Sequence, residues 1–335
     1  MCIRDSFLIS VASARSGGVV ARVEATADGA EPVTLTLDKL VHSHGITVTA
    51  AGVARGLGEV AQPVDVLGGE DLLLRKQSTL GETLAQQPGV TASTYGQGSS
   101  RPVIRGLGAD RIRILENGLD TGDVSSIGPD HAVAIDPLAA ERIEVVRGPA
   151  AVLWGANAIG GVVNVLDGRV PDKPAAAPVA AVVELEAGSN ADKRSGAAKL
   201  DGGGGHFAWH IDLYARDQDD YSSPAERPGH GGEPETGTVE NSWAKAQGAT
   251  IGGSFVADRG FIGIALGGYE TEHGIPGHHH HHHEEPSVFK EDHEEEEGGV
   301  YADLEQRRVD LHGQLDDPFR HFSAVKLSAG WRDYN

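Results

Sequence analysis

The stretch at residues 141–165, ERIEVVRGPAAVLWGANAIGGVVNV, decides the fold of this chain. Residues 141–146 alternate between two faces and predict a half-buried strand. The Arg-Gly-Pro sequence at 147–149 ends this strand, because proline has no backbone donor and glycine can take a positive φ. A second strand pattern follows at 162–165, so composition alone favours an ordinary hairpin of an α+β domain. The glycines and alanines between the two strands predict backbone packed closely against another surface.

Four segments of the chain resemble the plug domain of TonB-dependent outer-membrane receptors. The quoted stretch is similar to the segment that closes this domain, in which RGP, a G-x-x-A-x-G-G run and V-x-N-V follow one another. TLGETLAQQPGV, RPVIRGLGADRIRILENGL and IDPLAAERIEVVRGP match further plug signatures in the family's order. The resemblance implies an α+β plug domain followed by antiparallel strands of a transmembrane β-barrel. The signature residues are Arg105, Gly106, Arg147, Gly148, Pro149, Gly160, Gly161 and Asn164.

The charge balance and the residue content exclude several classes of function. A net charge of −21 and a pI near 5.1 argue against a nucleic-acid partner, since phosphates need a basic surface. The single cysteine leaves no disulfide framework and no thiol zinc motif. The sequence has no nucleophile elbow, no HExxH motif and no cysteine pair, so we do not expect an enzyme. It also has no apolar run long enough for a transmembrane helix, whereas membrane β-strands carry only weak alternation.

The first 61 residues precede the predicted plug domain. Residues 1–15 contain an apolar run like the end of a signal peptide. The basic region that normally precedes such a run is missing, so we expect a signal-peptide remnant and not the native start of the chain. Residues 16–61 are poor in core-forming side chains and predict a flexible leader. Within this leader, GITVTA at 45–50 resembles the TonB box, an extended segment that pairs by strand addition with the TonB energy-coupling protein in the periplasm. The core of the box is Ile46, Thr47, Val48 and Thr49.

Residues 62–171 predict a compact plug domain. We expect a helix over Thr79–Gln87, capped by Ser78 and ended by the Pro-Gly pair that follows it. The Asn-Gly pair at 117–118 predicts a tight turn between strands. Strands are expected over Val64–Leu67, Val90–Ser93, Pro102–Gly106 and Arg111–Gly118.

Residues 178–335 predict about seven strands from the N-terminal part of a larger barrel. We expect the small residues of the quoted stretch to pack against the wall of this barrel. In His206–Arg216 the apolar side chains share one face and the polar ones the other, as expected with lipid outside and water inside. Short turns alternate with long polar loops at Asp217–Asn241 and 272–299. Barrels that enclose a plug have about twenty-two strands, so we expect an N-terminal fragment. The strands are expected over Val179–Ala187, Lys193–Leu200, His206–Arg216, Ser242–Val256, Phe261–Thr271, Tyr301–Leu315 and Phe322–Tyr334.

Asp130 and His131 are candidate metal ligands. They supply an oxygen and an imidazole side by side, which Zn²⁺ accepts, but tetrahedral zinc needs further ligands from elsewhere. A solvated loop with a capping aspartate is the plainer interpretation of the two residues. However, TGD…PDHAV is similar to the zinc-uptake branch of the receptors. That resemblance implies that the Asp-His pair faces the extracellular vestibule and binds the metal.

The second long loop contains HGIPGHHHHHHEEPSVFKEDHEEEE at 273–297. Imidazole and carboxylate together favour Zn²⁺ or Ni²⁺, with Cu²⁺ as a further candidate, and capture should weaken as pH falls through the imidazole pKa near 6.5. An engineered tag and a merely solvating acidic loop are the alternatives. The flanking histidines and acids argue against a tag, and the histidines argue against a solvating loop. The candidate ligands are His273, His278, His279, His280, His281, His282, His283 and His293.

These features predict a TonB-dependent receptor of the bacterial outer membrane that actively takes up a divalent metal ion, with zinc as the transported ligand. Its expected partners are TonB, outer-membrane lipid and the metal, and no nucleic acid. The loop at 273–297 would collect ions, a site with Asp130 and His131 would hold them, and TonB would release them by remodelling the plug. A siderophore or haem receptor of the same family is the first alternative. A non-transporting surface metal-binding or adhesion protein is the second, and only a transporter needs the TonB box.

Overall fold

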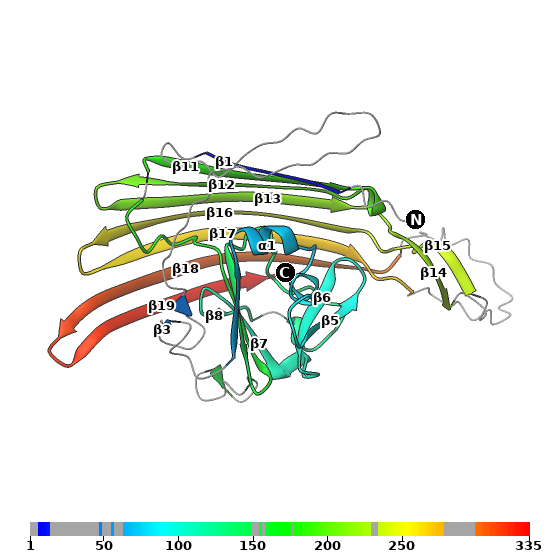
Figure 1. The fold of residues 1–335 in the computed structure, drawn as a ribbon, viewed down its shortest axis with the longest axis horizontal. Helices are drawn as coiled ribbons and strands as arrows, with labels where there is room; N and C mark the ends of the chain where they lie inside the picture. Colours follow the sequence, from blue (N-terminus) through cyan, green and yellow to red (C-terminus); the bar gives the residue numbers. More distant parts are fainter. Residues whose placement is uncertain are drawn as a thin grey trace, which may run out of the picture.

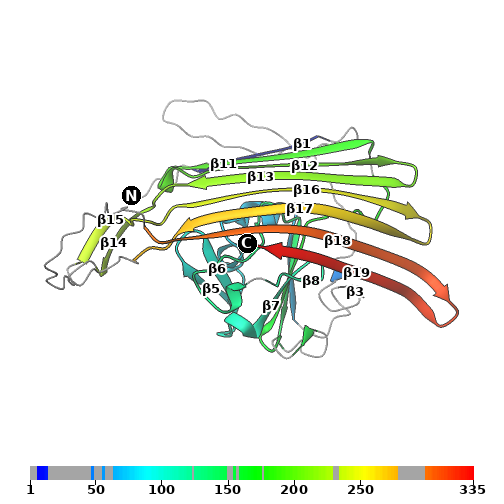
Figure 2. The same cartoon turned by 180° about the vertical axis from the view of Figure 1, so that it is seen from behind.

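The chain folds as a small plug held inside the curve of a long antiparallel sheet (Figures 1 and 2). This arrangement is the α+β plug domain with following antiparallel strands that the sequence predicts. In the described part of the chain, no helix has the length and apolar character to cross a membrane. The computed structural model describes residues 6–13, 47–48, 55–56, 63–122, 124–148, 154–155, 158–175, 177–228, 234–277 and 299–335.

The long sheet has eight strands in the order β1-β11-β12-β13-β16-β17-β18-β19, and all neighbours are antiparallel. Each of the strands expected after residue 178 overlaps one observed strand. An additional hairpin, β14 and β15, lies in the first long polar loop. The bounds are β1 Ser6–Ser13, β11 Val179–Gly188, β12 Arg194–Gly204, β13 Phe207–Gln218, β14 Ser222–Pro228, β15 Pro234–Thr238, β16 Ala244–Ala257, β17 Gly260–Gly274, β18 Tyr301–Phe319 and β19 Phe322–Tyr334, with the 3-10 turn η4 at Asn190–Asp192.

The segments before the plug pair with other strands where they are described. β1 pairs with β11 from Ser6 opposite Gly188 to Ser13 opposite Ala181. An apolar run can add here, because β11 would otherwise present a row of unpaired backbone groups. In the predicted TonB box, Thr47–Val48 forms β2 and pairs with β3, Arg55–Gly56. Ile46 and Thr49 lie outside the described residues.

The faces of the long sheet are inverted relative to a soluble protein. Along β13 the side chains of His210 and Asp212 are 0% and 2% exposed, whereas Phe207 and Leu213 are 66% and 55% exposed. The polar face packs against the plug, and the apolar face points away from it. The predicted alternation is therefore confirmed in this strand, and its outer surface suits lipid rather than water.

The plug is built on a five-stranded mixed sheet with the order β4-β9-β10-β7-β8. β9 and β10, which come from the quoted stretch, pair antiparallel, and β10 also pairs parallel with β7. The core between this sheet, the helices and the β5-β6 hairpin is apolar, with Leu84, Ile104 and Ile143 fully buried. The bounds are β4 Val64–Gly68, β5 Val90–Tyr95, β6 Ser99–Ile104, β7 Ile112–Glu116, β8 Leu119–Asp120, β9 Arg142–Arg147 and β10 Gly161–Leu166, with the 3-10 turns η2 Ala109–Arg111 and η3 Val124–Ser126.

Two short helices differ from the expected single helix. The predicted helix is observed as α2, Leu80–Leu84, and its N-cap is Thr79 rather than Ser78, because the Thr79 hydroxyl accepts from the Glu82 backbone N–H. The first helix, α1 at Glu70–Arg75, is not predicted. Its N-cap is a glycine without a side-chain cap, so the sequence lacks the usual start signal.

The glycine at the start of β10 permits close packing inside the plug. A Cβ on Gly161 would collide with the carbonyl oxygen of Val146 on β9. The expectation that the small residues of the quoted stretch meet the barrel wall is therefore wrong at this position. The close approach to the wall occurs instead at Gly252 on β16, where a Cβ would collide with the backbone carbonyl of Arg169.

Gly161→Ala is expected to lower the melting temperature of the protein more than Gly122→Ala. Both glycines have positive φ, 149° and 70°, which costs a non-glycine residue about 1–3 kcal/mol. Only at 161 would the added methyl also collide with a backbone carbonyl, which adds roughly another 1–3 kcal/mol of overpacking. Thermal unfolding in detergent measures the difference, and equal melting temperatures of the two variants would contradict this account.

Candidate functional site

The plug meets the long eight-stranded sheet, called the barrel wall below, at the ends of β17 and of the β5-β6 hairpin. There His273 contacts the loop that carries Asp130. The Nε2–H of His273 donates to the backbone carbonyl of Asp130 at 2.8 Å, and the side chain is 1% exposed. Its Nδ1 therefore carries the lone pair, and this atom is buried without a hydrogen-bond partner among the described residues. Gly98 makes room for the ring, since a Cβ there would collide with His273.

Asp130 and His131 lie side by side on this loop, at the surface of the plug. A Cβ on Gly128 would lie 2.7 Å from Asp130 Oδ1 and 2.6 Å from His131 Cδ2, so both side chains converge over this glycine. The hydroxyl of Ser99 on β6 holds the loop by donating to the carbonyls of Pro129 and His131, at 2.7 and 2.8 Å. His131 is exposed and Asp130 is half-buried.

The structure thus brings together three of the predicted metal ligands, Asp130, His131 and His273. They do not place three ligand atoms within 4.8 Å of one another; among the described residues, Glu141, Asp201 and His210 do so. The remaining candidates, His278, His279, His280, His281, His282, His283 and His293, lie outside the described residues. Because β17 ends at Gly274, this tract follows the junction directly in the chain.

A second contact fixes the same end of the plug to the barrel. The side-chain amide of Gln97 donates to the carbonyls of Asp219 and Ser242, each at 2.8 Å, and its oxygen accepts from Gln218 at 3.0 Å. Gly96 packs against Pro276, two residues beyond β17. The loop at 96–98 is therefore held by strands that flank both long loops.

The signature residues serve the plug's own architecture. Arg147 forms an ion pair with Asp65 on β4, and the Asn164 side chain accepts from the Gly118 backbone at 2.9 Å. The other signature positions are turn residues with positive φ, or they are close-packed glycines. Arg105, Gly106 and Gly148 have φ values of 51°, 79° and 92°. Gly161 begins β10, Gly160 directly precedes it, and Pro149 lies outside the described residues.

A buried ionic cluster joins the other end of the plug to the barrel. Arg169, 1% exposed, donates from Nε to Asp167 at 2.7 Å and from Nη1 to Asp310 on β18 at 2.8 Å, and it also pairs with Glu116. From the barrel, Arg308 donates to Glu116 at 2.7 Å and Arg332 donates to Asp310 at 3.3 Å. Three acids and three arginines meet here, so the charges balance.

The ionic cluster also fixes the protonation of Asp167. Burial alone would raise the pKa of Asp167, but the guanidinium of Arg169 outweighs burial and holds that pKa well below its ordinary value. Sequence reasoning missed this cluster. Arg308 and Asp310 are two residues apart on the inward face of β18, which is the only sequence signal that could have indicated it.

Comparison with known proteins gives one matching family and several relatives. Residues 57–162 match the model of the TonB-dependent Receptor Plug Domain. A hemin receptor of Yersinia pestis is 34% identical over 131 residues, which are 39% of this chain and 19% of the relative. An iron-regulated outer membrane virulence protein of Vibrio cholerae is 37% identical over 127 residues, 36% of this chain and 19% of the relative. A vitamin B12 transporter of Photobacterium profundum is 29% identical over 148 residues, 44% of this chain and 23% of the relative.

Solved structures extend the likeness beyond the plug. A copper transporter, OprC, has a TM-score of 0.60 at 18% identity and matches 80% of this chain and 37% of its own. The FrpB iron transporter of Neisseria meningitidis has a TM-score of 0.57 at 14% identity, with 80% and 40% of the two chains covered. At these identities the likeness concerns the fold alone. The chain spans about a fifth of the length of the relatives named above, 19% to 23%.

Proposed function

We propose, from the premise that this chain carries the plug domain of a TonB-dependent receptor of the bacterial outer membrane, that the whole protein takes up a metal-containing cargo. The matched proteins are receptors and transporters, which agrees with the prediction that this chain is not an enzyme. The proposed energy source is TonB, recognising the segment Ile46–Thr49, of which Thr47 and Val48 are extended. Release would follow when TonB remodels the plug.

The names of the relatives favour a metal held in a larger ligand. They are a hemin receptor, an iron-regulated protein and a vitamin B12 transporter, and none of these names mentions zinc. The alternative of a haem or siderophore receptor therefore has the better support from the comparisons. Imidazole also suits this cargo, because histidine is a common axial ligand of haem iron.

The junction at His273 supports a bare divalent ion, with zinc first and nickel or copper as further candidates. The observation that supports a bare ion is the position of the His273 imidazole. It contacts the plug loop of Asp130 and His131, and its Nδ1 keeps a buried lone pair. Imidazole and carboxylate are ligands that Zn²⁺ accepts. The histidine tract that follows β17 would raise the local ion concentration at this junction.

One experiment separates the two cargoes and tests the residues. Cells expressing the full-length receptor take up radioactive Zn²⁺ or hemin, and Asp130→Ala/His131→Ala is compared with Asp110→Ala, an exposed acid elsewhere on the plug. For a bare ion we expect at least about a tenfold loss of zinc uptake in the double variant, because even the loss of a partner that only orients a ligand costs ~10–100-fold in affinity. Hemin uptake without zinc uptake would establish the haem alternative. Unchanged uptake of both cargoes would overturn the assignment of Asp130 and His131.

A further inference from the structure

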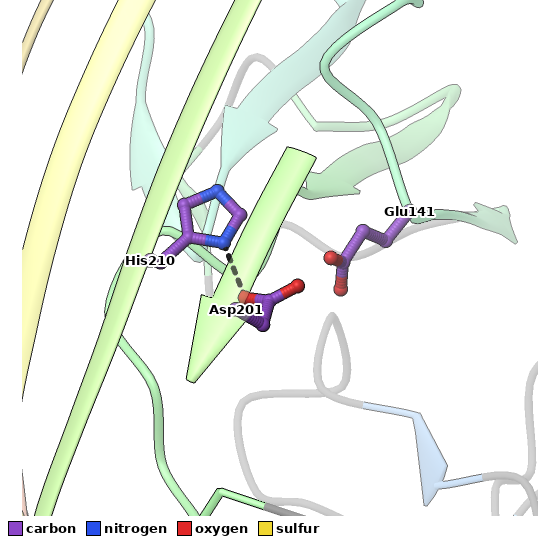
Figure 3. Close-up of side chains that lie close together, drawn as sticks. All are labelled: Glu141, Asp201 and His210. Atoms are coloured by element: carbon purple, nitrogen blue, oxygen red, sulfur yellow. Dashed lines mark hydrogen bonds and ion pairs between the residues drawn. The ribbon is translucent and has the colours of Figure 1, made fainter. Parts of the chain in front are cut away.

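A second group of ligand-type side chains lies between the plug and the barrel wall, away from the junction at His273. Glu141 comes from the plug just before β9, while Asp201 on β12 and His210 on β13 are direct cross-strand partners. One ligand atom from each residue lies within 4.8 Å of the others. In Figure 3 the Glu141 carboxylate points from the plug toward Asp201, which lies between it and the imidazole.

The imidazole in this group is held from behind by a third carboxylate. His210 is fully buried, and its Nε2 lies 3.0 Å from Asp212 Oδ2 while its Nδ1 lies 2.7 Å from Asp201 Oδ1. A carboxylate that accepts from the far ring nitrogen is the arrangement that orients metal-binding histidines. Asp212 is itself 2% exposed, and its Oδ1 is buried without a partner among the described residues.

The charges of this group do not balance, unlike those of the ionic cluster around Arg169. Glu141, Asp201 and Asp212 bring three negative charges. Among the described residues, Lys199 lies beside them, acts electrostatically on Glu141 and donates to the Ala139 carbonyl at 2.6 Å. Even with His210 protonated as a bridge between its two aspartates, one negative charge remains. A divalent cation bound between Nδ1 and the carboxylates would displace the proton from Nδ1, so His210 would become neutral. The two charges of the ion and the one of Lys199 would then balance the three carboxylates.

The group is far from the junction along the barrel wall. His210 pairs with Gly252, and Gly252 pairs with Ala265 on β17, so His273 is eight residues further along that strand. At ~3.3 Å per residue this is roughly 26 Å of strand. The group therefore lies toward the end of the sheet that carries the short turns.

We propose that Glu141, Asp201 and His210 form a second divalent-cation site, oriented by Asp212, at the interface between plug and barrel. One nitrogen and two carboxylate oxygens suit Zn²⁺ or Mn²⁺, with water completing the coordination. Because the ligands come from both parts, a bound ion would tie the plug to the wall. Movement of Glu141 with the plug would open the site.

The test uses the purified full-length receptor in detergent with Zn²⁺ alone as the probe. Crystals soaked in Zn²⁺ are expected to show an anomalous scattering peak between the three side chains. Glu141→Gln and Asp201→Asn should remove this peak and weaken one class of Zn²⁺ binding at least tenfold, whereas Glu70→Gln, an exposed plug residue, should not. Zn²⁺ should raise the melting temperature of the wild type more than that of Glu141→Gln, because the ion binds the folded state.

The proposal would be overturned if the peak were absent, or if Zn²⁺ bound equally to wild type and Glu141→Gln and raised their melting temperatures equally. His210 would then serve only to bridge Asp201 and Asp212 in the sheet. Misfolding does not obscure the result, because Glu141 is exposed. The measurement is independent of uptake. Asp130→Ala/His131→Ala should keep the peak. The cation site at Glu141, Asp201 and His210 can therefore be confirmed even if the proposed cargo is wrong, and it can be refuted even if that cargo is right.

Discussion

Arg169→Ala is expected to release the plug from the long sheet and to lower the melting temperature of the protein strongly. The side chain is 1% exposed and pairs with Asp167, Glu116 and Asp310, which are themselves 1–2% exposed. Among the described residues, its removal leaves Arg308 and Arg332 as the arginines paired with Glu116 and Asp310, and Asn117 as a side-chain donor to Asp167. Breaking a buried ion pair from one side costs about 3–5 kcal/mol, because an uncompensated charge stays behind.

Two comparisons make this first expectation specific. Arg113→Ala removes an ion pair with Asp120 whose side chains are 38% and 36% exposed, and it should cost less than ~1 kcal/mol. Arg169→Met/Glu116→Gln removes opposite charges together and should be less destabilised than the two single changes added. Thermal unfolding measures the stability of each variant. The entry of large antibiotics into cells measures whether the plug still closes the barrel. Similar losses in Arg169→Ala and Arg113→Ala would refute a structural role for the ionic cluster.

The pH dependence gives an independent check on Arg169. Because the pKa of Asp167 is lowered in the folded protein, its stabilising contribution is present above its unfolded pKa, ~3.9, and is lost as pH falls below that value. In Arg169→Ala the lowering cation is gone, and protonation at acid pH relieves the buried charge. The difference in melting temperature between wild type and variant should therefore narrow as pH falls from 7 toward 4. If the difference in melting temperature did not change with pH, the destabilisation by Arg169→Ala would come from lost packing and not from the unpaired charge of Asp167.

The fold could be predicted from the sequence where local patterns carry enough information. β13 was expected over His206–Arg216 and is observed over Phe207–Gln218, because strict alternation of apolar and polar side chains identifies a strand between lipid and a polar interior. The helix α1 could not be predicted, since it has only six residues and begins at an uncapped glycine. The hairpin of β14 and β15 lies in a stretch of polar residues with no alternation to reveal it.

Candidate ligand groups could be proposed from the sequence only where their residues are neighbours in the chain. Asp130 and His131 are adjacent, so the sequence offers them as a candidate pair, although their residue types alone favour a solvated loop and the family resemblance is what favours metal binding. Their meeting with His273 depends on how the plug sits against β17, which no local pattern encodes. The same holds for Glu141, which stands at the head of the stretch that decides the fold, yet it meets His210 only through the docking of plug and wall.

Ile251→Arg is expected to prevent assembly of the protein in the outer membrane. Ile251 lies in the middle of β16, is 56% exposed, and has Ile211 and Leu266 as cross-strand neighbours. If this face meets lipid, an arginine near the bilayer midplane costs about 2–4 kcal/mol. The receptor should then be depleted from outer-membrane fractions, and the remainder should unfold in detergent at lower temperature.

The same substitution decides whether the outer face of the long sheet meets lipid at all. On a water-exposed sheet, replacing an exposed isoleucine by arginine changes stability by only about ±0.5 kcal/mol, so normal assembly of Ile251→Arg would refute a lipid-facing surface. Glu270→Arg is the matched control, because Glu270 is also exposed on the outer face but lies near the end of β17. There the cost of an arginine falls to about 0–1 kcal/mol. A loss at Ile251 without a loss at Glu270 follows from burial in lipid and not from the added charge, because both variants add positive charge and Glu270→Arg adds more.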